Sequence, residues 1–484
     1  MVDLQAGALL LVALHAVIVF IATVYLSANR RPSAAIAWVL AIIFIPYLGA
    51  LVFLLIGVGR LPRSRREKQR EVNELIMART AGLDQVSHRE EWPEWLGSAA
   101  RLNRNLGALP MVGGNRIELL PDYEGSIASM VAAVDEATEF VHVQFYILVL
   151  DTVTQPFFDA LARAVKRGVA VHVLSDYLAC LMLPRRKETI AAFAEMGAEW
   201  RALLPLRFWR GQWRRPDMRN HRKLLIVDGR VGFTGSQNMI DSTYLKPGNL
   251  KRGLHWHELM MRLEGPAVRE LNAVFLADWY SETDEILPFD TSPVVLPAAA
   301  DLLDAQVLPS GPSFDNDNNL KLYAMLIHKA EHRVSITSPY FVPEESTMLA
   351  IVTAASRGVQ VELFASAIGD QALVYHAQRS YYEELLRAGV AIYLYREPTV
   401  LHAKHFTIDD DVSVVGSSNM DIRSFSLNME VSVLVHGAEF VQRMRVVQDE
   451  YRSNSRRVEL ADWLDRPAGA KVFDNLARLT SSLQ

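Results

Sequence analysis

The chain has 484 residues, which exceeds what one ordinary hydrophobic core supports and favours two domains or one large duplicated domain. Its formal net charge of −5 and its pI of about 6.3 argue against a general nucleic-acid-binding protein, which would usually be basic. The single cysteine, Cys180, excludes an intramolecular disulfide bond and a cysteine-based structural zinc site.

Two uncharged apolar stretches lie near the N-terminus, at residues 8–26 and 34–57. As a helix, the first would extend about 29 Å, close to the thickness of bilayer hydrocarbon. The second contains Pro46, which a membrane helix tolerates with a kink. The loop between them is short, so the sequence predicts a two-helix transmembrane hairpin over residues 1–60. A cleaved signal peptide is the rival interpretation, but Asp3 is the only charged side chain before the first stretch, and a second apolar stretch follows.

Basic residues are concentrated after the second stretch. Residues 60–70 contain six arginines and lysines, whereas the loop between the two stretches has Arg30 and Arg31. The positive-inside tendency therefore places everything after the hairpin in the cytoplasm. The same basic residues either act as a topology signal alone or also bind anionic lipid headgroups. Residues 61–114 are charged and mixed, and we expect a helical or partly flexible connector there.

From about residue 115, predicted strands alternate with predicted helices. The expected strands are residues 117–120, 140–147, 169–174, 333–337 and 359–364, and the expected helices are 125–137, 154–167, 186–196, 345–357 and 375–387. This alternation predicts a largely parallel sheet covered by helices on both faces. We therefore expect two α/β halves, residues 115–285 and 300–484, joined by a linker over 286–299.

An internal repeat carries the candidate chemistry. The motif His-x-Lys-x-x-x-x-Asp occurs twice and is followed each time, seven residues after its aspartate, by Gly-Ser-x-x-Asn. The first copy contains His221, Lys223, Asp228, Ser236 and Asn238, and the second contains His402, Lys404, Asp409, Ser417 and Asn419. Corresponding positions are all offset by 402 − 221 = 181 residues. A structural histidine on a strand would not require this repeated pattern, which indicates one composite site at the interface of the halves.

The residue types in the motif suit phosphodiester chemistry. Residues two apart in a strand point to the same face, so each histidine should lie beside its lysine. Lysines and neutral donors would bind the phosphate oxygens as charge builds up in the transition state. One neutral histidine can attack phosphorus while the other, protonated, donates to the leaving alkoxide. A metal site is the other interpretation, but a lysine beside each histidine repels a cation, so we expect no metal and no other cofactor.

Acidic residues are expected to orient the two imidazoles, because each ring needs a partner for its second nitrogen. Glu258 and Glu430 are the candidates, since each lies seven residues before a glycine at matching places in the two halves. The distance from the preceding motif asparagine differs between the halves, so Glu258 has alternatives, which are His255, His257 and Asp241. Asp228 and Asp409 fall in turn sequences, where support of the hairpin is an alternative to catalysis.

The paired motifs resemble the signatures of the phospholipase D superfamily, and the chain is more narrowly similar to its bacterial cardiolipin synthases. Further segments that carry the resemblance are residues 33–57, 338–343, 401–404, 416–425, 428–430 and 463–483. The resemblance implies a transmembrane hairpin followed by two pseudo-symmetric phospholipase D-like α/β halves with the active site at their interface. It places the protein in the bacterial inner membrane as a multi-pass protein with a cytoplasmic catalytic domain.

The resemblance also implies a reaction. His221 would attack the phosphodiester of phosphatidylglycerol and release glycerol, and a second phosphatidylglycerol would resolve the phosphatidyl-histidine to give cardiolipin, with His402 as general acid and base. The near-symmetry of the motifs leaves the reverse assignment open. Lys223, Lys404, Asn238 and Asn419 would bind phosphate oxygens, and Ser236 and Ser417 would position them. Phosphatidylglycerol and cardiolipin are the expected partners, with no nucleic acid, and a homo-oligomer is left open.

Other functions fit parts of the sequence. A membrane-bound phospholipase D or phosphatidyltransferase would use the same residues with water or another alcohol as acceptor. A nuclease shares the chemistry, but the acidic pI and the apolar N-terminus argue against it. A non-enzymatic membrane scaffold would not require the doubled motif. Residues 207–215 mix arginine with aromatic residues, which suits an anionic lipid interface, single-stranded nucleic acid or a plain surface loop.

Overall fold

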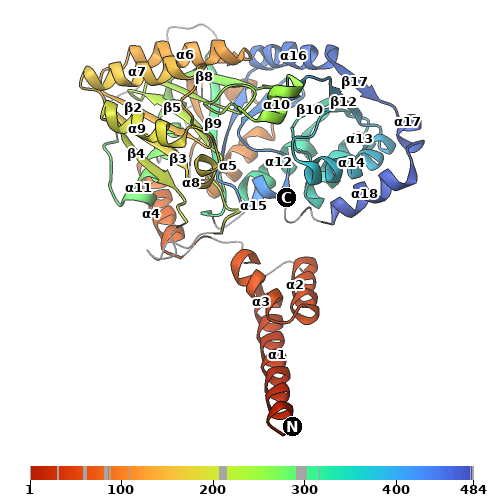
Figure 1. The fold of residues 1–484 in the computed structure, drawn as a ribbon. Coiled ribbons are helices and arrows are strands. Elements are labelled where there is room, and N and C mark those ends of the chain that lie inside the picture. Colours follow the sequence, from red (N-terminus) through yellow and green to blue (C-terminus); the bar gives the residue numbers. More distant parts are fainter. Residues whose placement is uncertain are drawn as a thin grey trace. The chain divides into compact units, whose positions relative to one another are not determined.

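The computed structural model describes residues 2–29, 32–57, 61, 63–80, 86, 89–107, 109–206, 215–289, 302–314, 317–479 and 481. The chain forms two compact units (Figure 1). The N-terminal unit comprises residues 1–60 with 213–217, and the α/β unit comprises residues 61–212 with 218–484. The predicted interfacial segment, residues 207–215, lies outside the described residues except for Arg215, which donates to Asp217 at 2.7 Å.

The N-terminal unit consists of apolar helices. They are α1 (Val2–Asn29), α2 (Pro32–Phe44), α3 (Leu48–Val52) and a π-helical turn (Phe53–Gly57). By length and composition, Gly7–Ala28 is the one segment among the described residues that is long and apolar enough to cross a membrane. The second predicted span is not one helix. It is interrupted after Phe44, because Pro46 lacks the donor that a continuing helix needs and Tyr47 adopts a φ of 60°.

A mixed sheet forms the framework of the α/β unit. Its 15 strands among the described residues follow the order β17-β12-β11-β10-β14-β15-β16-β9-β1-β8-β6-β5-β2-β3-β4. In chain order they are β1 (Val112–Leu120), β2 (Phe140–Phe145), β3 (Ala170–Asp176), β4 (Glu199–Leu203), β5 (Lys223–Val227), β6 (Val231–Gly235), β8 (Met260–Glu264), β9 (Leu303–Ser310), β10 (Arg333–Thr337), β11 (Gln360–Ser366), β12 (Ala391–Tyr395), β14 (His405–Ile408), β15 (Val412–Gly416), β16 (Glu430–His436) and β17 (Ser455–Val458).

The prediction of a largely parallel sheet is wrong. Within this sheet, parallel pairing is confined to β2-β3-β4 and β10-β11-β12, the strands joined by helices. The remaining neighbours are antiparallel, among them β5 with β6 and β14 with β15. These two pairs are the motif hairpins, and strands joined by a tight turn must run antiparallel.

The sheet contains the predicted repeat. The order β1-β8-β6-β5-β2-β3-β4 in the first half matches β9-β16-β15-β14-β10-β11-β12 in the second. The halves meet where β1 pairs with β9 in antiparallel fashion, so one sheet runs through both. Predicted helix ends are also confirmed in matched pairs, because Gly168 and Gly358 follow helices with φ values of 88° and 91°, which glycine adopts without strain.

Helices cover the sheet and join the halves. The longer ones are α4 (Arg63–Arg79), α5 (Leu96–Gly107), α6 (Tyr123–Asp135), α7 (Gln155–Lys166), α9 (Arg186–Met196), α11 (Pro266–Thr283), α12 (Asn318–Lys329), α13 (Glu345–Ser356), α14 (Ala372–Arg387), α16 (Ala438–Ser453) and α18 (Ala468–Arg478). The short ones are α8 (Tyr177–Leu181), α10 (Pro247–Arg252), α15 (Ile422–Ser426) and α17 (Leu460–Leu464). Side chains of α11 and α16, including Trp279 and Tyr451, share one hydrophobic cluster, so a common core crosses the boundary between the halves.

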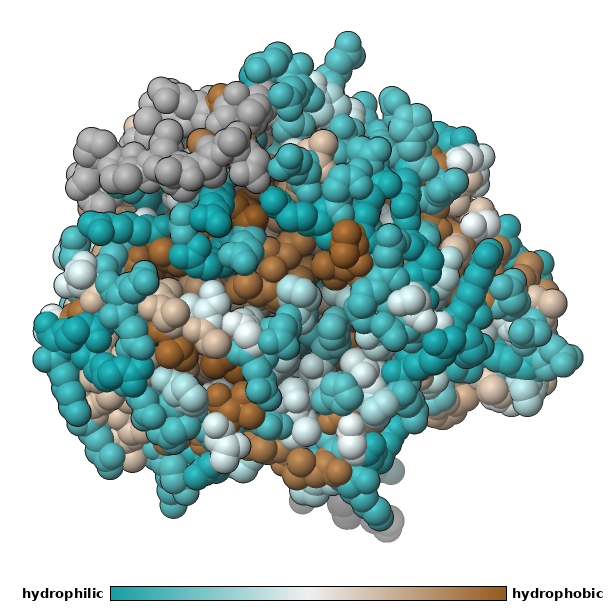
Figure 2. Space-filling model, turned by 90° about the horizontal axis from the view of Figure 1, so that it is seen from above, coloured by the Kyte–Doolittle hydropathy of each residue, from teal (hydrophilic) through white to brown (hydrophobic). Residues whose placement is uncertain are grey.

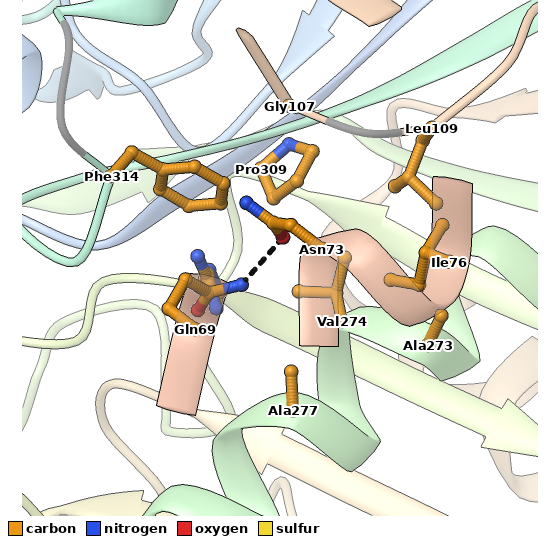
Figure 3. A pocket seen from close by; sticks show the side chains of 11 residues that line it. Gln69, Asn73, Ile76, Gly107, Leu109, Ala273, Val274, Ala277, Pro309 and Phe314 are labelled. Atoms are coloured by element: carbon orange, nitrogen blue, oxygen red, sulfur yellow. Dashed lines mark hydrogen bonds between the residues drawn. The ribbon is translucent and has the colours of Figure 1, made fainter. Parts of the chain in front are cut away.

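The predicted connector is built into the α/β unit. Buried residues of α5, such as Leu96, belong to the core cluster of the second half. Helix α4 lies beside α11, and Gln69 and Asn73 of α4 face a small cavity of about 10 Å³ together with Val274 and Pro309 (Figure 3). This volume holds about one water molecule, so the cavity is a packing gap and not a substrate site. Figure 2 shows a face on which hydrophilic residues predominate, as expected of a surface in water.

Candidate active site

Two short pairings between the halves seat the motif histidines. His221 lies directly before β5, and its backbone N–H donates to the carbonyl of Met429 at 2.8 Å. His402 lies between β13 (Thr399–Leu401) and β14, and its N–H donates to the carbonyl of His257, at the end of β7 (His255–His257), at 2.8 Å. Strands β7 and β13 run parallel as a separate two-stranded sheet. Each histidine is therefore fixed by backbone of the opposite half.

The histidine side chains are paired across the same boundary. Nδ1 of His221 lies 3.1 Å from Oε2 of Glu430, and Nδ1 of His402 lies 2.7 Å from Oε1 of Glu258. Both candidate orienting residues thus contact a motif histidine, and each contacts the one from the other half. A carboxylate at Nδ1 favours the tautomer that carries hydrogen there and leaves the lone pair on Nε2.

Burial and charge set the protonation of these groups. Burial lowers the pKa of His221 to about 4, against the opposing effect of Glu430, and burial likewise lowers the pKa of His402 against Glu258. Burial alone would raise the pKa of Glu430 and Glu258, but the facing histidine lowers each below its ordinary value. Burial therefore favours a neutral His221 imidazole, and the facing histidines favour the ionised form of both carboxylates.

The two motif lysines are buried beside their histidines. Nζ of Lys223 donates to the carbonyl of His221 at 2.6 Å, and Nζ of Lys404 donates to the carbonyl of His402 at 2.5 Å. Burial lowers the pKa of Lys223 to about 7 and that of Lys404 to about 8. An ammonium has three donors, so after one bond to a carbonyl each can still bind an oxyanion.

The motif serines lie against the strands that carry the glutamates. The hydroxyl of Ser417 donates to Oε2 of Glu430 at 2.5 Å and accepts from the N–H of Val431 at 3.0 Å. The hydroxyl of Ser236 accepts from the N–H of Leu259 at 2.9 Å. These contacts hold the start of β16 and of β8, and Ser417 also fixes the carboxylate that faces His221. The predicted role of the serines in positioning phosphate remains a prediction.

The motif asparagines differ in their contacts. Asn238 accepts from the N–H of Ile147 at 3.2 Å and donates to the hydroxyl of Tyr244 at 2.9 Å, and Tyr244 in turn donates to Glu258 at 3.3 Å. Oδ1 of Asn419 is buried without a hydrogen-bond partner among the described residues. Asn238 is thus tied into the orienting network of His402, whereas the Asn419 amide oxygen has an unmet hydrogen-bonding capacity.

The motif aspartates support loops at the far end of the hairpins. Oδ1 of Asp228 accepts from the N–H groups of Glu139 and Phe140, and Oδ2 accepts from Thr138. Asp409 in the same way accepts from three successive backbone N–H groups, residues 331–333. Asp228 lies five positions after Lys223, which along an extended strand corresponds to about 16 Å. Of the two roles considered, these contacts favour the structural one.

The alternatives to Glu258 have other contacts. Nε2 of His255 lies 2.9 Å from the hydroxyl of Thr399, and Nε2 of His257 lies 3.7 Å from Glu450. The carboxylate of Asp241 accepts from the N–H of Thr243 at 2.8 Å. Within the part of the chain that the structure describes, no group of three or more histidine, cysteine or acidic residues is arranged to hold a metal ion.

Sequence reasoning missed several residues of the site. The ring of Tyr146 meets that of His221 edge-on at 4.9 Å, and the rings of Tyr244 and Tyr340 lie 6.4 and 6.0 Å from that of His402. The hydroxyl of Ser424 donates to Oε1 of Glu430 at 3.1 Å. Tyr146 follows β2, which pairs with β5, and Tyr340 follows β10, which pairs with β14. Their positions just after the predicted neighbours of the motif strands could have identified them as residues of the site.

Comparison with known proteins identifies the family. A model described as the cardiolipin synthase, phospholipase D-like domain matches residues 130–279 and 323–450, more than half of the chain. The chain belongs to the cardiolipin synthase family. This family lies within the phospholipase D superfamily, so the chain is an enzyme, a phosphatidyltransferase. A second model, described as phospholipase D-nuclease N-terminal, matches residues 16–57.

Members of the family are similar to the chain over nearly its whole length. Cardiolipin synthase A of Proteus mirabilis is 30% identical over 461 residues, which covers 94% of this chain and 94% of that protein. The cardiolipin synthase of Geobacillus kaustophilus is 31% identical and covers 96% of this chain and 92% of that protein. Among solved structures, the phosphatidylserine synthase of Haemophilus influenzae matches 79% of this chain and 99% of its own with a TM-score of 0.57 and 14% identity, which shows a common fold.

Proposed function

We propose that the protein transfers a phosphatidyl group from one phosphatidylglycerol to the hydroxyl of another, giving cardiolipin and glycerol. The observation that carries this proposal is the assembly of the two motifs into one site, in which His221 faces Glu430 and His402 faces Glu258 across the boundary between the halves. The relatives named cardiolipin synthase support the choice of substrate and product.

His221 is the nucleophile in this proposal. Burial and the two motif lysines lower the pKa of its imidazole and favour the neutral ring, whereas Glu430 raises this pKa. His402 instead has one lysine, Lys404, and two carboxylates, Glu258 and Asp370, around it. A neutral ring is the better nucleophile, and a ring near two carboxylates is more readily protonated. This difference in surrounding charge therefore agrees with the roles that the family resemblance implies, His221 as nucleophile and His402 as general acid and base.

The first step transfers the phosphatidyl group to the enzyme. In the reactive form of the enzyme His402 carries a proton on both ring nitrogens, a state that the facing carboxylate of Glu258 favours. Nε2 of neutral His221 attacks phosphorus, the bond from phosphorus to the glycerol oxygen breaks, and His402 gives its Nε2 proton to that oxygen. Lys223 and Lys404 stabilise the negative charge on the non-bridging oxygens, a task for which other phosphoryl-transfer enzymes use a metal ion. Asn419, whose amide oxygen has no partner among the described residues, can turn its NH₂ group toward the same oxygens.

The second step releases the product. Neutral His402 takes the proton from the hydroxyl of a second phosphatidylglycerol, the resulting oxygen attacks phosphorus, and the bond between phosphorus and His221 breaks. Cardiolipin leaves, and both histidines return to their initial protonation states. Water in place of the second lipid would give phosphatidic acid, which is the product of the alternative phospholipase D reaction.

We further propose that the protein is held in the bacterial inner membrane by its N-terminal unit, with the α/β unit at the cytoplasmic face. The apolar segment Gly7–Ala28 is long enough to span the bilayer, and the basic residues of α4, such as Arg63 and Lys68, follow the N-terminal unit directly. This location gives the site direct access to lipid substrates.

The purified protein, incubated with phosphatidylglycerol vesicles in the presence of a metal chelator, tests the reaction. Cardiolipin and glycerol in equal amounts support the proposal, whereas phosphatidic acid without cardiolipin contradicts it. His221→Ala should abolish product and the acid-labile phosphatidyl-enzyme. His328→Ala, at an exposed position on α12, is the matched control and should retain both. A phosphatidyl-enzyme that persists in His221→Ala but not in His402→Ala would reverse the two roles.

A further inference from the structure

The second apolar segment of the N-terminal unit folds back on itself. The rings of Trp38 in α2 and Phe53 in the π-helical turn lie 5.3 Å apart, edge to face. In a continuous helix, fifteen residues would separate them by about 22 Å. The chain has therefore reversed its direction between these residues.

Close packing at a glycine fixes this reversal. A Cβ atom placed on Gly49 would lie 2.5 Å from the carbonyl oxygen of Ala41, so only glycine permits α3 to approach the backbone of α2 so closely. The backbone at the turn is hydrogen-bonded, since the N–H of Ile45 donates to Ala41 and that of Gly49 donates to Ile45. Satisfied backbone groups are the condition under which an irregular segment is tolerated at membrane depth.

Contacts with α1 show how far the segment reaches. The hydroxyl of Tyr47, at the turn, donates to the carbonyl of Leu11 at 2.7 Å, and its ring lies 5.8 Å from that of His15. After the turn, Phe53 returns to the ring of Tyr25, at 6.3 Å. The 13 residues of α2 extend about 20 Å, which is short of the roughly 30 Å of bilayer hydrocarbon. The second apolar segment therefore begins near the Asn29 end of α1, reaches along α1 as far as Leu11, and returns toward the Asn29 end.

We infer that the N-terminal unit crosses the bilayer once, through α1, and that α2, α3 and the π-helical turn form a re-entrant hairpin that enters and leaves on the cytoplasmic side. The surface that contacts lipid acyl chains includes the exposed side chains of Ile36, Leu40, Ile43, Phe44, Leu48, Leu51 and Leu54. This inference rests on the proposed membrane location and deepens it.

The distribution of charge supports the same topology independently. With two full spans, Arg30 and Arg31 would lie on the far side of the membrane from the basic residues of α4. With a re-entrant hairpin, all of these arginines and lysines lie on one side, and Asp3 is the charged side chain on the other. The second arrangement satisfies the positive-inside tendency without exception.

Accessibility of single cysteines tests the topology in the full-length chain. Because Cys180 is the only native cysteine and is buried, a Cys180→Ser background leaves one thiol in each of the variants Gln5→Cys, Ala28→Cys and Glu71→Cys. A membrane-impermeant maleimide is applied to spheroplasts before and after lysis. We expect Gln5→Cys to be labelled before lysis, and Ala28→Cys and Glu71→Cys only after it.

Labelling of Ala28→Cys from outside together with protection of Gln5→Cys and Glu71→Cys would establish two spans and overturn the inference. A protease-cleavable tag before Met1 gives a second readout that does not depend on thiol reactivity. Cleavage of the tag from outside while position 71 stays protected requires an odd number of crossings, and protection of both requires an even number. If position 71 is labelled from outside, the proposed cytoplasmic location fails, while re-entry is still judged by whether positions 28 and 71 share a side.

Discussion

Glu430 of the second half faces His221 of the first at 3.1 Å, and the hydroxyl of Ser417 holds the same carboxylate at 2.5 Å. The imidazole of the proposed nucleophile is therefore oriented by a residue that lies 209 positions away in the chain. In the other pair, Glu258 of the first half faces His402 of the second. Each half therefore supplies one histidine and the glutamate that faces the histidine of the other half.

Removing the charge of the orienting carboxylate should slow catalysis. In Glu430→Gln, the amide no longer stabilises the positive charge that develops on His221 as it forms the bond to phosphorus. We expect kcat to fall about 10- to 100-fold, the usual range for loss of such a supporting residue. Quenched-flow measurement of phosphatidyl-enzyme formation should show the loss in the first step. Unchanged formation of the intermediate would contradict the assignment of Glu430 to the nucleophile.

The lysines should set the alkaline limit of activity. Their pKa values, lowered by burial to about 7 for Lys223 and about 8 for Lys404, lie below that of a free lysine, so protons leave as the pH rises through this range. The charge that stabilises the phosphate oxygens then disappears, and kcat/KM, which reports the free enzyme, should decline above about pH 7 to 8.

Arginine remains protonated at these pH values, which provides the control for this assignment. Any activity that Lys223→Arg retains should decline near pH 8, where Lys404 loses its proton, and not near pH 7. An alkaline limb that stays near pH 7 in Lys223→Arg would show that another group is responsible.

The motif aspartates should affect stability more than chemistry. In Asp228→Asn, the amide cannot accept all the hydrogen bonds that Thr138, Glu139 and Phe140 donate to the carboxylate. We expect the free energy of unfolding to fall by roughly 1–3 kcal/mol. Thermal unfolding in detergent measures this, and kcat per folded molecule should remain within about twofold of the native value. A large loss of kcat at unchanged stability would restore Asp228 to a catalytic role.

A buried ion pair behind the first motif should be replaceable. Nη1 of Arg222 lies 2.7 Å from Asp278, and both side chains are buried. Arg222→Met alone leaves the Asp278 charge without its cation, which should cost about 3–5 kcal/mol of stability. The double variant Arg222→Met/Asp278→Asn removes the charge but keeps an acceptor for the amides of Gln144 and Asn220, so it should recover part of this loss. The second motif carries Ala403 at the matching position, so activity should return with folding. A stable but inactive double variant would contradict this expectation.

The sequence predicted what local pattern and repetition encode. The repeat of His221 and His402 at a constant offset indicated one composite site, and the alternation of strands and helices gave the boundaries of elements such as β10 and α9 within a few residues. Both features depend on residues that are near one another in the chain or aligned by duplication. The candidate orienting residues Glu258 and Glu430 could be chosen for the same reason.

Features that depend on contacts between residues far apart in the chain could not be predicted from the sequence. The exchange of glutamates between the halves depends on how Asn220 lies beside Met429 and how β7 lies beside β13, and no local pattern reports such contacts. The reversal at Tyr47 was also missed, because an apolar segment has the same composition whether it spans or turns back. The tyrosines of the site resembled ordinary strand residues until neighbouring strands placed them next to the histidines.

The exchanged glutamates also bear on how such a duplicated chain can evolve. After a gene duplication, two copies are ordinarily free to diverge, and one can decay while the other retains the activity. Here Glu258 contacts His402 of the opposite repeat, and Glu430 contacts His221. Under the proposed mechanism neither repeat can degenerate without disabling the other, so selection would act on the pair as a single inherited unit.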